Sequence, residues 1–194
     1  PLEAEYLSKL EQEHLESLIL AGENVPSDLE AGIKIGEEIA SIALSRASND
    51  GMKNAQAPKA VSDSLRAAAF ERFGWQWENL ESPVRPVGLT PLFGKVKMWN
   101  VPIVEATRPE IPPAPGSEAF VKDVKILEDY ADNVTNERRR IANFWQDGLG
   151  TYTPPGHWND IAGEYILKYK MNVIRTARTF AYMNMAIMDG GISC

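Results

Sequence analysis

The chain has 194 residues, of which 44% are hydrophobic, and a net charge of −7. This length and composition are typical of one globular domain or slightly more, with a substantial core. The negative charge argues against a nucleic-acid partner, because phosphate binding requires a basic surface. No apolar run approaches the roughly 20 residues that span a bilayer, and the single cysteine, Cys194, excludes an internal disulfide and a cysteine-based zinc site.

Two amphipathic helices are predicted at the start of the chain. The first covers about residues 2–21, where apolar residues recur with the 3.6-residue period of a helix. The second is capped by Ser27 or Asp28, whose short side chains can accept from free backbone N–H groups, and it continues to about Ala47. A turn and a polar linker follow, and a weaker helix is predicted over 59–73.

A proline-rich segment occupies residues 83–116 and carries eight of the 13 prolines. Proline lacks the N–H that a helix or a sheet requires, so regular structure is not expected there. A free linker would not carry as many large apolar residues as this segment does: Leu92, Phe93, Val96, Met98, Trp99, Val101 and Ile103. We therefore predict an ordered arm that lies across the helices, with 95–101 as its candidate extended stretch.

Helical patterns return after the arm. Ser117 can cap one helix, Thr135 can cap the next, which ends near Gly148, another follows Pro155, and the last begins near Asn172. The predicted fold is therefore all-α, a multi-helix bundle of seven helices with one long Pro-rich arm. We divide the chain into N-terminal helices over 1–82, the arm over 83–116 and bundle helices over 117–194.

The most informative stretch lies between residues 143 and 162, where the sequence reads NFWQDGLGTYTPPGHWNDIA. We interpret it as a helix end, a turn stiffened by Pro154 and Pro155, and a helix start. It resembles the N-terminal half of the bacterial vanadium-dependent haloperoxidase family, within the type 2 phosphatidic acid phosphatase superfamily. The resemblance extends over most of the chain, including the run PLFGKVK over 91–97 and the helix that ends at Cys194.

The resemblance implies an enzyme whose reacting groups lie after position 194. In the intact family, vanadate is bonded to a histidine and activates peroxide to oxidise a halide, and phosphatase relatives hold phosphate in the same oxyanion cage with the histidine as nucleophile. This chain lacks the family's Lys-x6-Arg-Pro, Ser-Gly-His and Ser-Arg-x5-His-x3-Asp patterns. It would therefore supply scaffold and one wall of the cage, with no catalytic residue, metal or vanadate of its own.

The partners implied by the resemblance are the missing C-terminal half and, in the intact protein, small anions: vanadate, phosphate or halide. The resemblance also favours a periplasmic or secreted location. Homo-oligomerisation is left open. The predicted function is a vanadium haloperoxidase. The alternatives are an acid phosphatase of the same superfamily and a non-catalytic helical module for binding or assembly.

Asp147 is the first candidate site residue. It lies near the C-terminal end of a predicted helix, where the macrodipole disfavours an anion, so a compensating cation is expected nearby. In the family, the matching acidic residue pairs with an oxyanion-binding arginine from the second half, which implies that Asp147 orients a guanidinium. The alternative is a solvent-exposed aspartate before a glycine turn.

Three neighbouring residues are also candidates. His157, placed in the first turn of its helix, is interpreted either as a pocket residue that donates to substrate or to Asp147, or as a buried histidine that closes the corner. Trp158 is a candidate pocket residue, although it and Trp145 are more simply core aromatics. Asn159 is expected to cap the corner or to hydrogen-bond across it.

The last predicted helix carries one further candidate. Asp189 lies among methionines, so its carboxylate needs a partner, and residues after Cys194 are one source of it. The alternative is a purely structural aspartate. Without that missing half, the helix is expected to expose an apolar face comprising Phe180, Met185, Met188 and Ile192.

Overall fold

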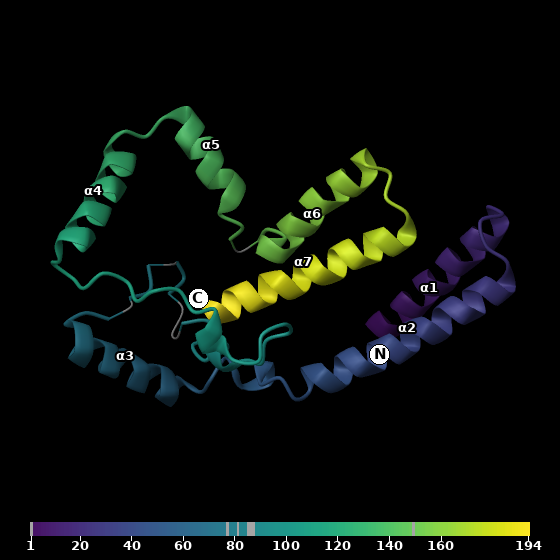
Figure 1. The fold of residues 1–194 in the computed structure, drawn as a ribbon, viewed down its shortest axis with the longest axis horizontal. Helices are drawn as coiled ribbons and strands as arrows, with labels where there is room; N and C mark the ends of the chain where they lie inside the picture. Colours follow the sequence, from purple (N-terminus) through teal and green to yellow (C-terminus); the bar gives the residue numbers. More distant parts are fainter. Residues whose placement is uncertain (1, 77, 81, 85–87, 149) are drawn as a thin grey trace. The chain divides into compact units, whose positions relative to one another are not determined.

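The computed structural model describes residues 2–76, 78–80, 82–84, 88–148 and 150–194. Residues 85–87 of the predicted arm and Leu149 of the predicted corner lie outside this set. The described residues form seven α-helices and three short 3-10 helices, with no strand among them (Figure 1). The all-α prediction is confirmed. The chain divides into two compact units, Pro1–Asp50 and Gly51–Cys194.

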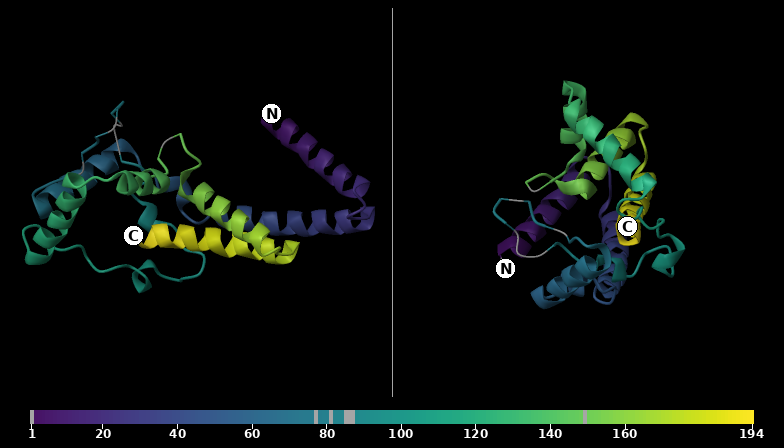
Figure 2. Two further views of the ribbon diagram at one scale, coloured as in Figure 1. Left: turned by 90° about the horizontal axis from the view of Figure 1, so that it is seen from above. Right: turned by 90° about the vertical axis from the view of Figure 1, so that its left-hand side faces the viewer.

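The first unit consists of α1 (Leu2–Leu20) and α2 (Pro26–Ala47), which open away from the turn that joins them (Figure 2). Pro26 begins α2, because the first helical position needs no N–H donor. The capping residue is therefore Val25, and the predicted cap at Ser27 or Asp28 is wrong. Asp28 instead accepts a hydrogen bond from the Val25 backbone N–H at 3.3 Å.

The second unit holds the remaining elements. Two of its helices begin with the predicted side-chain caps: Ser117 accepts from the Phe120 N–H at 3.2 Å and Thr135 from the Arg138 N–H at 3.1 Å. The last helix, predicted to begin near Asn172, is capped by the Asn172 side chain, which accepts from the Arg175 N–H at 2.9 Å. The elements are η1 (Met52–Asn54), α3 (Lys59–Phe73), η2 (Phe93–Lys95), η3 (Val104–Ala106), α4 (Glu118–Asp132), α5 (Asn136–Trp145), α6 (Thr153–Lys168) and α7 (Val173–Ser193). None of the described helices is both long and apolar enough to cross a membrane.

The arm packs against the C-terminal part of α7, where Figure 1 shows the teal segment beside the end of the chain. Together they bury the apolar cluster of the second unit, which comprises Ala55, Val96, Met98 and Ile192. Gly191 permits the close approach, because a Cβ there would lie 3.1 Å from the ring of Phe93. Within the stretch predicted as extended, Lys95 belongs to η2 and Val96 follows in extended conformation.

Asp189 obtains its partners from this arm, as the structural alternative implies, and residues after Cys194 are not required to supply them. Its buried carboxylate accepts from the backbone N–H of Trp99 at 2.7 Å and of Asn100 at 2.9 Å, and from the Asn100 side chain at 3.2 Å. One turn further on, the hydroxyls of Thr107 and Ser193 lie 2.8 Å apart. Polar contacts therefore secure the arm on both sides of the apolar cluster.

The apolar face predicted to be exposed on α7 is largely covered. Ile192 is buried, and Phe180, Met185 and Met188 are half-buried. The prediction is wrong because it treated the arm and the last helix as separate, whereas the arm covers this end of α7. The exposed large apolar residues of α7 lie nearer its start: Val173, Ile174 and Tyr182.

Candidate functional site

The candidate site is the connection between α5 and α6. Asp147 follows the end of α5 with φ +40°, in the left-handed region that aspartate tolerates better than most residues. α6 already begins at Thr153, so Pro154 and Pro155 lie in its first turn instead of forming the predicted turn before it. This start is favourable because first-turn N–H groups have no partner to lose. His157 is thus the fifth residue of α6 and lies beyond its first turn.

Asp147 and His157 form a buried pair. The imidazole Nδ1 lies 2.9 and 3.0 Å from the two carboxylate oxygens, and the side chains are 2% and 10% exposed. An ionised carboxylate can only accept, so Nδ1 is the donor of this hydrogen bond, and in a neutral imidazole Nε2 is then the nitrogen that carries the lone pair. The predicted contact between His157 and Asp147 is therefore observed, and the compensating group beside Asp147 is an imidazole.

Aromatic rings surround this pair. The Trp145 ring stacks on the imidazole at 5.0 Å between centroids, and the rings of Phe144 and Tyr152 meet it edge-on at 4.5 and 5.5 Å. Gly156 makes room for Tyr152, because a Cβ there would lie 2.8 Å from the Tyr152 Cβ. Such apolar surroundings lower the local dielectric and strengthen the hydrogen bond between His157 and Asp147.

The interpretation of the two tryptophans as core residues is wrong. Trp145 is 49% exposed and Trp158 is 42% exposed. They lie 5.7 Å apart between ring centroids, at the surface of the corner. No other described element covers them, which is why aromatic side chains that looked like core remain accessible. Trp158 contacts Trp145, and in the described part of the chain it has no ring contact or hydrogen bond with the buried pair.

Asn159 connects two helices. Its side-chain amide forms a reciprocal pair with that of Asn184 on α7, at 3.0 and 2.9 Å, and also donates to the Pro155 carbonyl at 2.6 Å. Asn184 donates in addition to the Phe180 carbonyl at 2.9 Å. Asn159 was predicted to cap the corner or to hydrogen-bond across it. Its side chain instead bonds within α6 and connects α6 to α7, which lie side by side (Figures 1 and 2). Asn184 is not among the predicted site residues, although its polar side chain between two methionines of the last helix is a signal for such a contact.

The arrangement can orient a proton acceptor. Asp147 fixes the imidazole, and Nε2 of His157 can accept a hydrogen bond or a proton.

The side chains that contact His157 are a carboxylate and three aromatic rings, so they do not by themselves fit vanadate, which needs several cationic donors. The described residues contain no group of three or more histidine, cysteine or acidic side chains that could hold a metal ion. Comparison of the chain with protein-family models, curated proteins and solved structures gives no match.

Proposed function

We propose that the chain is the helical scaffold of a vanadium haloperoxidase-like enzyme and forms one wall of its oxyanion site. The observation that carries the proposal is the buried pair of Asp147 and His157, because it lies inside the stretch that resembles the family. A carboxylate offers about four acceptor positions, and His157 supplies a single N–H. Asp147 therefore keeps capacity to orient a guanidinium from a second part of the enzyme, while the aromatic rings exclude water.

Exposed apolar surface on the neighbouring helices supports a missing partner. No described residue of α4 or α5 is buried. Large apolar residues of these helices, such as Leu127 at 70% exposure and Ile141 at 45%, are accessible. An amphipathic helix gains most of its stability by burying its apolar face. The C-terminal half of the haloperoxidase fold is the covering element that we propose.

An acid phosphatase of the same superfamily is the alternative enzyme, since it would use the same scaffold around phosphate. A non-catalytic helical module is the alternative outside enzymology, and in it the corner serves only as architecture. The three functions differ in what happens when the charge of Asp147 is removed without a change of side-chain shape. Both enzymes lose turnover, whereas the helical module loses stability alone.

The test uses the full-length protein, including any sequence that continues after Cys194. Vanadate binding is measured by 51V NMR, halide oxidation by bromination of monochlorodimedone with peroxide, and phosphatase activity with p-nitrophenyl phosphate. Asp147→Asn keeps the shape of the side chain and removes its charge, and we expect it to lower turnover or vanadate affinity about 10-fold to 100-fold, as for other groups that orient a ligand-binding side chain. His157→Gln should have an effect of similar size.

Asp160→Asn is the matched control, because Asp160 is an exposed carboxylate on α6 near the same corner. It should leave vanadate binding and turnover unchanged. A folded full-length protein that neither binds vanadate nor turns over either substrate would overturn both enzyme proposals. Turnover that is indifferent to Asp147→Asn would remove the corner from the site.

A further inference from the structure

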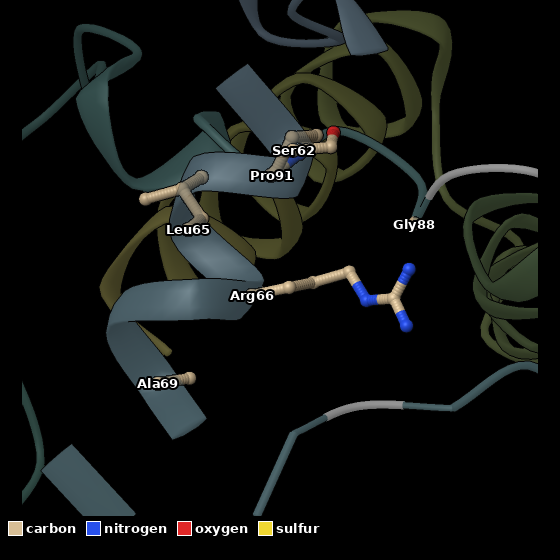
Figure 3. A pocket seen from close by; sticks show the side chains of 6 residues that line it. All are labelled: Ser62, Leu65, Arg66, Ala69, Gly88 and Pro91. Atoms are coloured by element: carbon tan, nitrogen blue, oxygen red, sulfur yellow. The ribbon is translucent and has the colours of Figure 1, made fainter. Parts of the chain in front are cut away.

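A cavity lies beside α3, and it is separate from the corner that holds Asp147 and His157. Its volume is about 290 Å³. The residues that line it come from α3 and from the arm: Ser62, Leu65, Arg66, Ala69, Gly88 and Pro91 (Figure 3). No residue of the corner lines it, so it is independent of the proposed function.

Two polar groups at this cavity are buried without a partner. The Ser62 hydroxyl and the Arg66 Nε have no hydrogen bond, and Ser62 is 4% exposed. Buried polar groups in folded proteins almost always form hydrogen bonds. Two such groups without a partner at the wall of one cavity therefore indicate a ligand. The two residues are four apart on α3 and therefore share one face. Figure 3 shows both side chains leaving the same side of the helix, with the guanidinium near Gly88.

Arg66 is the one charged side chain among the described residues that line the cavity. The neighbouring cation on α3, Lys59, pairs with Asp63 at 2.6 Å. No described carboxylate lies within ion-pair distance of Arg66. A guanidinium is always protonated, and its planar N–H groups match the two oxygens of a carboxylate. The remaining wall is apolar, because it is formed by Leu65, Ala69 and Pro91.

The arm side of the cavity is held in place without a ligand. The Gln56 side chain donates to the Gly88 carbonyl at 3.2 Å and accepts from the Thr90 N–H at 3.0 Å. The Leu92 N–H donates to the Ala55 carbonyl at 3.1 Å. These contacts connect the arm to the segment that leads into α3, so the cavity is preformed, as small-molecule sites usually are.

We infer that this cavity binds a small carboxylate with an apolar body. The carboxylate accepts from Arg66 and from the Ser62 hydroxyl, and the hydrocarbon part lies against Leu65, Ala69 and Pro91. The volume is close to the lower end of the roughly 300 to 1,000 Å³ found for small-molecule sites, so the ligand is small and nearly fills it.

Sodium octanoate titrated into the full chain tests this inference, with binding followed by isothermal calorimetry and by the amide NMR signals of Ser62 and Gly88. We expect saturable binding that moves both signals. Arg66→Met should weaken it about 10-fold to 100-fold, the range for loss of a hydrogen bond to a charged group, and Ser62→Ala should weaken it severalfold. The control is Arg72→Met, an exposed arginine on the same helix, which should bind like the wild type.

Two further probes separate the ligand classes. 1-Octanol has an apolar chain similar to that of octanoate but no charge, whereas inorganic phosphate is charged but has no chain. Neither compound should saturate the site. The inference is overturned if wild-type protein does not saturate with octanoate, if either probe binds as tightly as octanoate, or if Arg66→Met binds like Arg72→Met. If Arg66→Met loses its helical circular dichroism, octanoate binding is compared instead between Arg66→Lys and Arg72→Lys. Both variants keep the positive charge, but only Arg66→Lys removes the planar guanidinium from the cavity.

Discussion

Replacement of Asp189 by alanine should release the arm from α7. The carboxylate accepts three hydrogen bonds, two of them from the backbone N–H groups of Trp99 and Asn100. Leaving a buried donor without a partner costs about 1–3 kcal/mol. Water can reach part of this site because Trp99 and Asn100 are themselves exposed, so we expect a total loss of about 2–3 kcal/mol, below the sum of two fully buried donors.

Amide hydrogen exchange measures this loss at the arm itself. A cost of that size corresponds to exchange about 30-fold to 150-fold faster at Trp99 and Asn100, since 1.36 kcal/mol is a factor of ten. Trypsin should also cleave faster after Lys97, two residues before Trp99. Asp160→Ala, which removes an exposed carboxylate from α6, is the control and should leave both rates unchanged. Unchanged exchange at Trp99 in Asp189→Ala would refute the role of the carboxylate as the anchor of the arm.

Three further changes test the corner, its link to α7 and one surface ion pair. Gly156→Ala should destabilise the protein by about 1–3 kcal/mol through overpacking against Tyr152, although alanine is the better helix former, and urea unfolding measures it. Asn184→Ala should lower the free energy of unfolding by about 1 kcal/mol. Adding Asn159→Ala should lower it little further, because both changes remove the same amide pair. Additive losses in the same urea assay would contradict the pairing. The hydrogen bond from Arg140 lowers the pKa of Glu137 below its ordinary value of 4.5. The stabilisation from this ion pair is therefore present above pH 4.5 and is lost as the pH falls through the lowered pKa. An NMR titration in which Arg140→Gln fails to raise the pKa of Glu137 would contradict this cause.

Local signals account for what the sequence predicted well. A cap needs only one side chain and an N–H three residues further along the chain, so Ser117 and Thr135 could be predicted directly from the sequence. The contact between Asp147 and His157 spans ten residues across one turn, which made it a foreseeable pair. The error at the start of α6 has a local cause as well. Prolines were read as a turn, whereas a helix accepts them in its first turn.

Contacts between distant segments account for the failures. Asp189 and Trp99 are 90 residues apart, and no periodicity connects an apolar helix with a proline-rich arm. Helical periodicity indicates that one face is apolar without saying what covers it. Ile192 was therefore predicted to be exposed and is buried. The unpaired groups of Ser62 and Arg66 were likewise invisible, because burial and pairing exist only once the arm lies beside α3.

α7 is the element that connects these observations within the second unit. Near its C-terminal end, Asp189 holds the arm, and five residues earlier Asn184 holds Asn159 of α6. Asn159 lies two residues after His157, so the helix that carries the imidazole is fixed to the helix that carries the arm. The two anchors use different residues and different partners, five positions apart on α7. The arm can therefore be released at Asp189 while α6 stays attached through Asn184, and the position of His157 depends on the amide pair more directly than on the arm.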